Sequence, residues 1–214
     1  MLITVSFFII IANILQVSGK RATEAQKYVT LTLFGCAFFI MGFLCHFLDT
    51  TERGVLFGLK INLMAELSLY MISFNVFQQV YNIDTKSVFM IPITLVYVFL
   101  MYMIGVTGTS LAGSGMLFKE FHRAQSSNGV PFLAVTDNWG MYFLIVFKIL
   151  LLVMLSFFFL KAYIKSAVLG YRINKTFFLI VFIPLLVFIV GDFVIPPQIQ
   201  FLFLPPFIAI GGTL

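Results

Sequence analysis

Hydrophobic residues are concentrated in seven blocks along this chain. Most blocks approach the ~20 residues that a helix needs to cross the hydrocarbon core of a membrane. The strict alternation of polar and apolar residues that membrane β-strands require is absent from them. The pattern therefore predicts an all-α membrane protein, a bundle of seven transmembrane helices. The predicted spans are approximately 2–17, 28–47, 54–80, 88–106, 139–162, 176–195 and 199–214.

The composition excludes an ordinary soluble domain. Hydrophobic residues make up 61% and charged residues 10% of the chain, against the roughly 25% charged residues of soluble domains. The net charge of +5 follows the membrane topology, so we expect the bilayer as a partner and no nucleic acid. Cys36 and Cys45 lie in one predicted helix about 13 Å apart, too far to form a disulfide with each other.

The distribution of basic residues predicts the orientation. No basic residue precedes the first span, and Lys20, Arg21 and Lys27 follow it, so the N-terminus is expected outside. Alternating sides from there, the segments that contain most basic residues fall inside. The inner residues are Lys20, Arg21, Lys27, Lys86, Lys161, Lys165, Arg172 and Lys175, and the outer ones are Arg53, Lys119 and Arg123. With seven spans, the C-terminus is expected in the cytoplasm.

Two segments of the chain add to this topology: one long connection and the last apolar block. The outer segment 107–138 is long for a loop and contains an amphipathic turn around Phe118 and Phe121. The block 199–214, as a helix, reaches only ~24 Å, less than the ~30 Å hydrocarbon core. We therefore expect the last span to be truncated, and residues 1–214 to be a single domain, a fragment of a longer protein with a cytoplasmic output domain after Leu214.

Ionisable residues within predicted spans are the candidates for chemistry, because they are costly in hydrocarbon. Lys60 and Glu66 lie in the third span, where Asn62 and Glu66 are one turn apart on one face. Lys148 lies about nine residues into the fifth span, and Asp192 lies near the outer end of the sixth. All map to the outer half or the middle of the bilayer. An unpaired ammonium at this depth is unfavourable, so Lys148 is predicted to pair with Glu66 or, as second choice, Asp192, or else to be neutral.

Two interpretations of these polar residues remain open: an ion pair that only fixes helix packing, and a ligand site in the outer half of the bundle. The candidate ligand-binding residues are Asn62, Glu66, Tyr70, Trp139, Tyr142, Lys148 and Asp192. Cys45, His46 and Asp49 suggest a metal corner, but Cys45 and His46 point in different directions on a helix and no second histidine is near in the sequence, so no metal site is predicted there. No phosphate loop, nucleophile elbow or zinc-binding helix is found, so we expect no cofactor, metal or catalytic activity in this region.

Three stretches resemble the N-terminal seven-transmembrane sensor region of bacterial histidine kinases and diguanylate cyclases. Residues 31–81 resemble two spans that are joined by a short outer turn and end in a stretch with phenylalanine and tyrosine. Residues 138–193 resemble the fifth and sixth spans, with Tyr171 and Arg172 in a basic loop before a span that contains a proline. The closing "LPPFIAIGG" resembles the start of the last span.

This resemblance implies a sensory or receptor domain in the bacterial inner membrane. It would detect an external or membrane-soluble small molecule and signal through the seventh helix to a cytoplasmic histidine kinase or diguanylate cyclase, as a homodimer. A small seven-span transporter is the alternative, although no internal repeat is found. A retinal protein is rejected, because the Schiff-base lysine of such proteins lies in the seventh span and no lysine follows Lys175.

Overall fold

The computed structural model describes residues 2–18, 24–80, 87–108, 116–125, 129 and 131–168. These residues form mainly helices, with one pair of strands. The helices are α1 (Leu2–Ser18), α2 (Glu24–Leu48), α3 (Glu52–Val80), α4 (Ser87–Val106) and α5 (Trp139–Val168), and the strands are β1 (Phe118–Gln125) and β2 (Pro131–Asp137). The first five predicted spans each coincide with one helix and are confirmed as helices. The predicted spans 176–195 and 199–214, with Asp192, lie outside the described residues.

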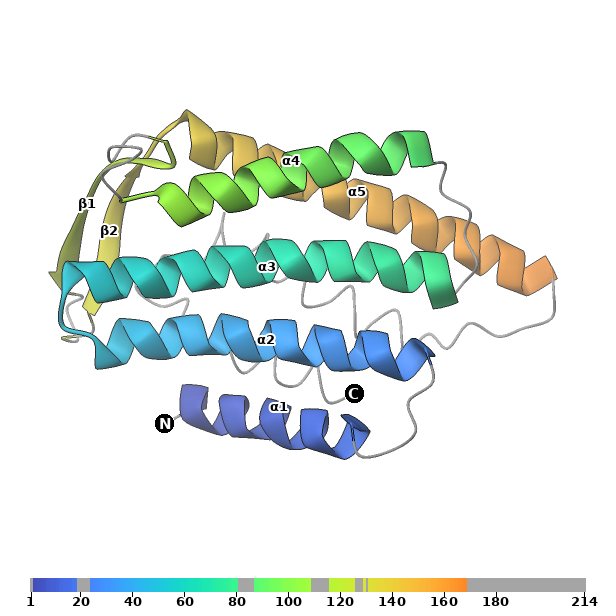
Figure 1. Ribbon diagram of the computed structural model, residues 1–214, viewed down its shortest axis with the longest axis horizontal. Helices are drawn as coiled ribbons and strands as arrows, with labels where there is room; N and C mark the ends of the chain where they lie inside the picture. Colours follow the sequence, from blue (N-terminus) through green and yellow to red (C-terminus); the bar gives the residue numbers. More distant parts are fainter. Residues whose placement is uncertain are drawn as a thin grey trace.

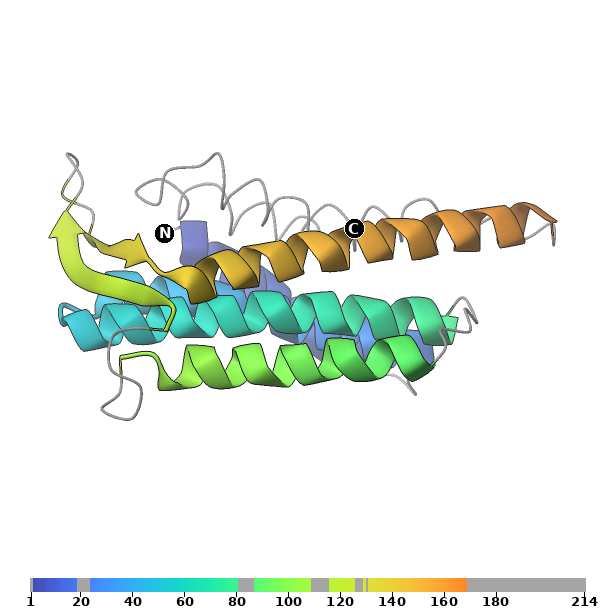
Figure 2. The same ribbon diagram turned by 90° about the horizontal axis from the view of Figure 1, so that it is seen from above.

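Helix α3 is the centre of the described bundle. It packs against α2, α4 and α5, while α1 packs against α2. Figure 1 shows α1, α2 and α3 side by side, and Figure 2 shows α4 and α5 on opposite sides of α3. Because α3 borders three helices, a change along it can reach most of the bundle.

Three helices contain a stretch long and apolar enough to cross a membrane: Glu52–Asn75 in α3, Phe89–Val106 in α4 and Trp139–Phe158 in α5. The apolar stretches of α1 and α2, Ile3–Gln16 and Thr30–Cys45, are shorter. Many large hydrophobic side chains of α4 and α5 are exposed on the outside of the bundle. Hydrocarbon is a favourable surrounding for such a surface, so the described part of the chain has the properties of a helical membrane protein.

Helices α2 and α3 form an antiparallel hairpin around a short turn. The Asp49 carboxylate accepts hydrogen bonds from the backbone N–H of Thr51 (2.8 Å) and from its hydroxyl (2.7 Å), which orders the turn. Along the hairpin, glycines of α2 let the helices approach closely. A Cβ at Gly42 would overlap the Asn62 side chain and lie 2.7 Å from the carbonyl oxygen of Gly58. Small residues have the same role in many membrane helix pairs.

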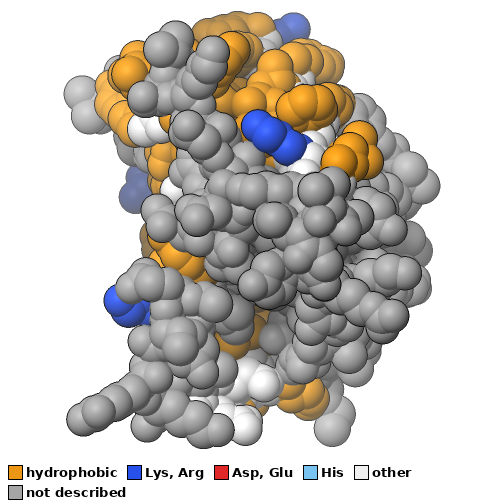
Figure 3. Space-filling view, turned by 90° about the vertical axis from the view of Figure 1, so that its right-hand side faces the viewer, with side chains coloured by type: hydrophobic (Ala, Val, Ile, Leu, Met, Phe, Trp, Pro, Cys, Tyr) orange, Lys and Arg blue, Asp and Glu red, His pale blue; other side chains and the backbone are white. Residues whose placement is uncertain are grey.

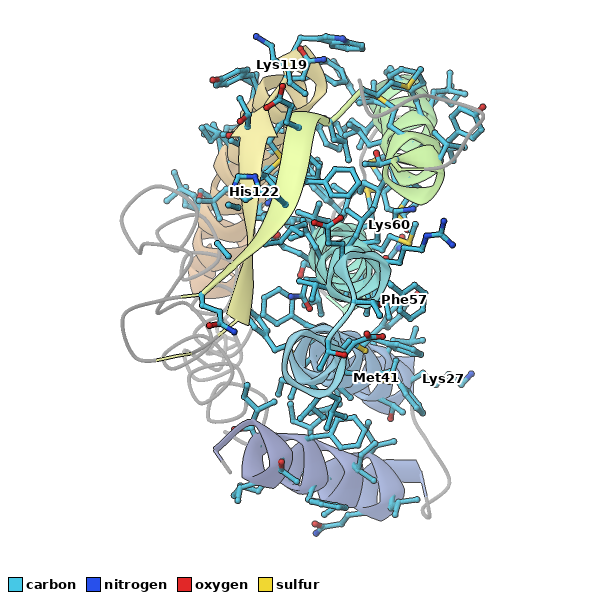
Figure 4. The ribbon with its side chains drawn as sticks, turned by 90° about the vertical axis from the view of Figure 1, so that its left-hand side faces the viewer. Lys27, Met41, Phe57, Lys60, Lys119 and His122 are labelled. Atoms are coloured by element: carbon cyan, nitrogen blue, oxygen red, sulfur yellow. The ribbon has the colours of Figure 1, made fainter. Side chains whose placement is uncertain are left out.

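The part of the predicted loop that the structure describes contains a β-hairpin at one end of the bundle. Strands β1 and β2 are antiparallel, with Phe121 opposite Val135, so the amphipathic turn predicted around Phe118 and Phe121 is a strand. Phe118 and Leu133 are buried, whereas Lys119 and His122 are exposed. Figure 4 shows the hairpin across the ends of the helices, with Lys119 and His122 on it. The hairpin therefore caps the bundle with one apolar face and one polar face.

Candidate functional site

A buried ion pair joins α3 to α5. The Lys148 ammonium donates a hydrogen bond to Glu66 Oε2 at 2.7 Å, and the two side chains are only 1% and 4% exposed. The predicted pairing of Lys148 with Glu66 is thus confirmed. Each charge lowers the cost of burying the other, because attraction between opposite charges is strong where water is absent.

The sequence of α5 explains why Lys148 points inward. Leu144, Lys148, Leu151 and Leu155 follow helical spacing, and all four are buried. Lys148 thus occupies one position of an otherwise leucine-lined stripe that faces the bundle. A rotation of α5 that moved Lys148 to the surface would also expose the three leucines. Lys148 therefore has to be paired inside the bundle.

Asn62 lies one turn before Glu66 and is also buried, with 6% of its surface exposed. Its Oδ1 has no conventional hydrogen-bond partner among the described residues. The atom lies against Gly42 of α2, where a Cβ would overlap it. Its position beside the Gly42 backbone suits a weak Cα–H···O contact, a type that recurs where helices cross closely. Asn62 therefore serves the α2–α3 contact, while Glu66 serves the α3–α5 contact.

The other candidate residues divide into three groups. Tyr70 is fully buried one turn beyond Glu66 on α3. Trp139 and Tyr142, in the first turn of α5, are 55% and 61% exposed. Trp139 is about two and a half turns from Lys148, so it points to the opposite side of α5. Asp192 lies outside the described residues. The structure brings Asn62, Glu66, Tyr70 and Lys148 into the interior and leaves Trp139 and Tyr142 on its surface.

Two further polar contacts join α3 to α4. The Lys60 ammonium donates to the Gly105 carbonyl oxygen at 2.9 Å, and the hydroxyls of Ser68 and Tyr97 are 3.2 Å apart. Gly105 is in the last turn of α4, where backbone carbonyls lack helical partners and a cation is favourable. The sequence contains one signal for the first contact, a lysine about two turns into an apolar helix. It contains no signal for which backbone carbonyl the lysine would meet.

The polar contacts described so far in the interior join one helix to another. Within the described ranges, no group of three or more His, Cys, Asp or Glu residues is placed to hold a metal ion. The Glu66 carboxylate and the Lys148 ammonium neutralise each other at hydrogen-bond distance. Such a pair can be separated by a competing polar group or by a change of protonation, and its separation would release α5 from α3 at that point.

Comparison with known proteins identifies no relative of this chain: no family model matches the sequence, and neither a curated protein nor a solved structure is similar to it.

Proposed function

We propose that this chain is a membrane-embedded sensory domain, in which a small molecule acting on the hairpin end or the outer half of the bundle changes the packing of α5 against α3. The observation that carries the proposal is the connection of β2 to α5. Strand β2 ends at Asp137 and α5 begins at Trp139, so only Asn138 separates them. A displacement of the hairpin is thereby passed directly to a helix of 30 residues.

The path of α5 fits a transmitting role. Figures 1 and 2 show that α5 crosses the bundle from the hairpin and extends beyond the other helices at the opposite end. The Lys148–Glu66 pair is the charged contact that holds it to α3 along this path. Two arrangements of α5, with the pair closed and with it opened, would provide the states between which a ligand shifts the population.

The proposed output is a cytoplasmic histidine kinase or diguanylate cyclase, as the resemblance of residues 31–81 and 138–193 implies. The test is the gene sequence beyond the codon for Leu214, which should continue in frame into such a catalytic module. The encoded full-length protein, reconstituted in nanodiscs, should then form phosphohistidine from ATP or cyclic dinucleotide from GTP. A stop codon directly after Leu214 would overturn the proposal.

The proposed orientation places the hairpin outside the cell. Figure 3 views the opposite end of the molecule, where basic side chains are visible between residues drawn in grey. Lys27, near the start of α2, and Lys161, in the last turns of α5, are exposed toward this end. These two lysines support a cytoplasmic position for that end, because basic residues favour the cytoplasmic side.

Cysteine labelling on intact cells tests the orientation. Lys119 lies on β1 at the hairpin end, and Lys161 lies near the end of α5 at the opposite end of the molecule. Both side chains are exposed, so a cysteine at either position would be accessible to a reagent. In a background without Cys36 and Cys45, Lys119→Cys should react with a membrane-impermeant maleimide and Lys161→Cys should react only after lysis. The reverse result would place the hairpin in the cytoplasm and exclude an external ligand.

A small transporter is the second candidate, and the buried pair is the feature that favours it. Ionisable residues inside membrane spans often line the paths of ions and protons. Proton uptake into sealed vesicles that contain the purified chain, with loss of uptake in Glu66→Gln, would support transport. Vesicles without uptake, together with an in-frame output domain, would support the sensor.

A further inference from the structure

A second charged region lies on the side of α3 that faces away from Glu66. Arg53, Phe57 and Lys60 are four and three residues apart, a spacing that places them on one side of a helix. Arg53 is exposed, Phe57 is 58% exposed, and Lys60 is partly buried. Figure 4 shows Phe57 and Lys60 pointing to the same side of the molecule, with Met41 of α2 next to them. We call these three residues of α3 the basic face.

Lys60 is held in place but retains capacity for an anion. Its ammonium has three donors, of which one is used on the Gly105 carbonyl oxygen at 2.9 Å. No second acceptor for it is found in the part of the chain that the structure describes. Gly105 is one residue before the end of α4 at Val106, so the contact fixes the ammonium near the hairpin end of the bundle.

The depth of the basic face matches the boundary between headgroups and acyl chains. Lys60 lies about 12 Å along the helix axis from Glu52, the first residue of α3. A lysine side chain at that depth extends toward the nearer membrane surface while its stem stays in apolar surroundings. Arg53, almost two turns nearer to the helix start, lies at the level of the headgroups. Arg53 and Lys60 therefore follow each other along the axis of α3, which is also the direction in which a lipid molecule extends into the membrane.

The neighbouring surface is apolar and equally exposed. Phe34 and Phe38 of α2 are exposed hydrophobic residues, and Met41 continues the same side of that helix. Two acidic residues lie near this surface: Asp49 is engaged in the α2–α3 turn through Thr51, and Glu52 directly precedes Arg53 at the exposed start of α3. An occupant of this surface thus needs a negative group for two cations and a long apolar part for the phenylalanines.

We propose that the basic face binds an anionic phospholipid of the leaflet at the hairpin end. Its phosphate is placed between Arg53 and Lys60, and an acyl chain runs along Phe57 and the exposed side of α2. Arg53 can bind phosphate oxygens with two parallel N–H groups, and Lys60 contributes a point charge. Since two cations face one phosphate, a lipid with net negative charge is preferred over a zwitterionic one. This proposal is independent of the sensory function.

Native mass spectrometry of the detergent-purified protein, titrated with phosphatidylglycerol or phosphatidylcholine, tests the proposal. Phosphatidylglycerol should bind more tightly than phosphatidylcholine. Arg53→Gln and Lys60→Gln should each weaken its binding roughly fivefold, the effect of one cation near a lipid surface. Lys119→Gln, which removes an exposed cation of the hairpin at the same end of the molecule, is the matched control and should leave binding unchanged.

Three results would overturn the assignment. Equal affinity for the two lipids would show that charge is not recognised, and equal weakening by Lys119→Gln would show that only the net charge counts. Displacement of the lipid by excess inorganic phosphate would indicate an ion site rather than a lipid site. Lys60→Gln also removes the contact with Gly105, so this variant could fail to fold. In that case Arg53→Gln alone tests the proposal, because the exposed Arg53 side chain can be changed without disturbing packing.

Discussion

Helix α3 is held to its neighbours in two different ways. Its contact with α2 is close and continuous, with Gly35 next to Leu69 and Gly42 next to Asn62. Its contact with α5 is less extensive and contains the buried Lys148–Glu66 pair. Close packing of backbones gives many small attractive contacts that fail together only when the helices separate. An ion pair concentrates the attraction at one point that a single chemical event can remove.

This difference suggests a division of roles. The α2–α3 hairpin is a rigid reference, since its glycines leave no room for one helix to slide past the other. In the proposed sensor, the α3–α5 interface would be the place that changes, because its ion pair can be opened by a single chemical event while the apolar contacts of α5 remain. The sensor that we propose would need both a fixed part and a movable part, and α3 would contact each of them.

Breaking the ion pair should give the largest effect. Lys148→Met leaves the Glu66 carboxylate buried beside an apolar side chain and should lower the free energy of unfolding by about 3 kcal/mol. Lys161→Met, an exposed lysine of the same helix, should change it little. Unfolding in bicelles, followed by steric trapping or by α-helical circular dichroism, provides the measurement.

The double variant Lys148→Met with Glu66→Gln sharpens this prediction. It removes both charges, so most of the lost stability should return if the two residues act as a pair. A folded double variant that still signals would make the pair structural, and one that folds without responding would make it part of the ligand site. Additive losses would contradict the pairing.

The α3–α5 contact could be predicted from the sequence more fully than the α2–α3 contact. The ion pair follows from depth, because Glu66 and Lys148 lie near the middle of two apolar helices, α3 and α5, that both begin at the hairpin end and run in the same sense. The contact between Gly42 and Asn62 depends on the register of α2 against α3, which hydrophobic periodicity does not specify to one residue. The helices themselves were predictable because their apolar blocks are long and bounded by polar segments.

The β-hairpin was missed for a physical reason. Strand prediction depends on a spacing of two between residues of one face, but Phe118 and Phe121 are three apart. An irregularity between Phe118 and Glu120 inserts an extra residue into β1, and such a bulge shifts the following side chains to the other face. Both phenylalanines therefore turn toward the bundle despite a spacing that suggested a helical turn.

Disturbing the α2–α3 interface should give the second largest loss of stability. A Cβ at Gly42 would overlap Asn62 and approach the Gly58 carbonyl, so Gly42→Ala must push α2 and α3 apart and should cost about 1–3 kcal/mol. Gly105→Ala is the matched control, because its Cβ would meet only Met64 Cε at 3.6 Å, an ordinary contact. The same unfolding measurement applies, and equal effects of the two substitutions would contradict the tight register.

Removing the hydrogen bond between the Ser68 and Tyr97 hydroxyls, which joins α3 to α4, should give the smallest effect. The donor of this hydrogen bond can be identified. The Ser68 hydroxyl donates its one proton to the Met64 carbonyl oxygen at 2.7 Å, so the Tyr97 hydroxyl must be the donor in the 3.2 Å contact. Tyr97→Phe removes that donor and leaves Ser68 bonded to its own helix. The expected loss is about 0.6 kcal/mol, the average for hydrogen bonds between membrane helices.

Ser68→Ala should cost more than Tyr97→Phe, because it leaves a partly buried tyrosine hydroxyl without its acceptor. Tyr102→Phe is the control for loss of a hydroxyl on α4, since Tyr102 is exposed on that helix. Unfolding of the three single variants and of the Ser68–Tyr97 double variant gives the coupling between the two residues. A coupling of zero would contradict the hydrogen bond itself, and a larger loss in Tyr97→Phe than in Ser68→Ala would reverse the assignment of the donor. If instead the coupling matched that of Lys148 with Glu66, α4 would be held as firmly as α5, and the movable part of the bundle would have to include both helices.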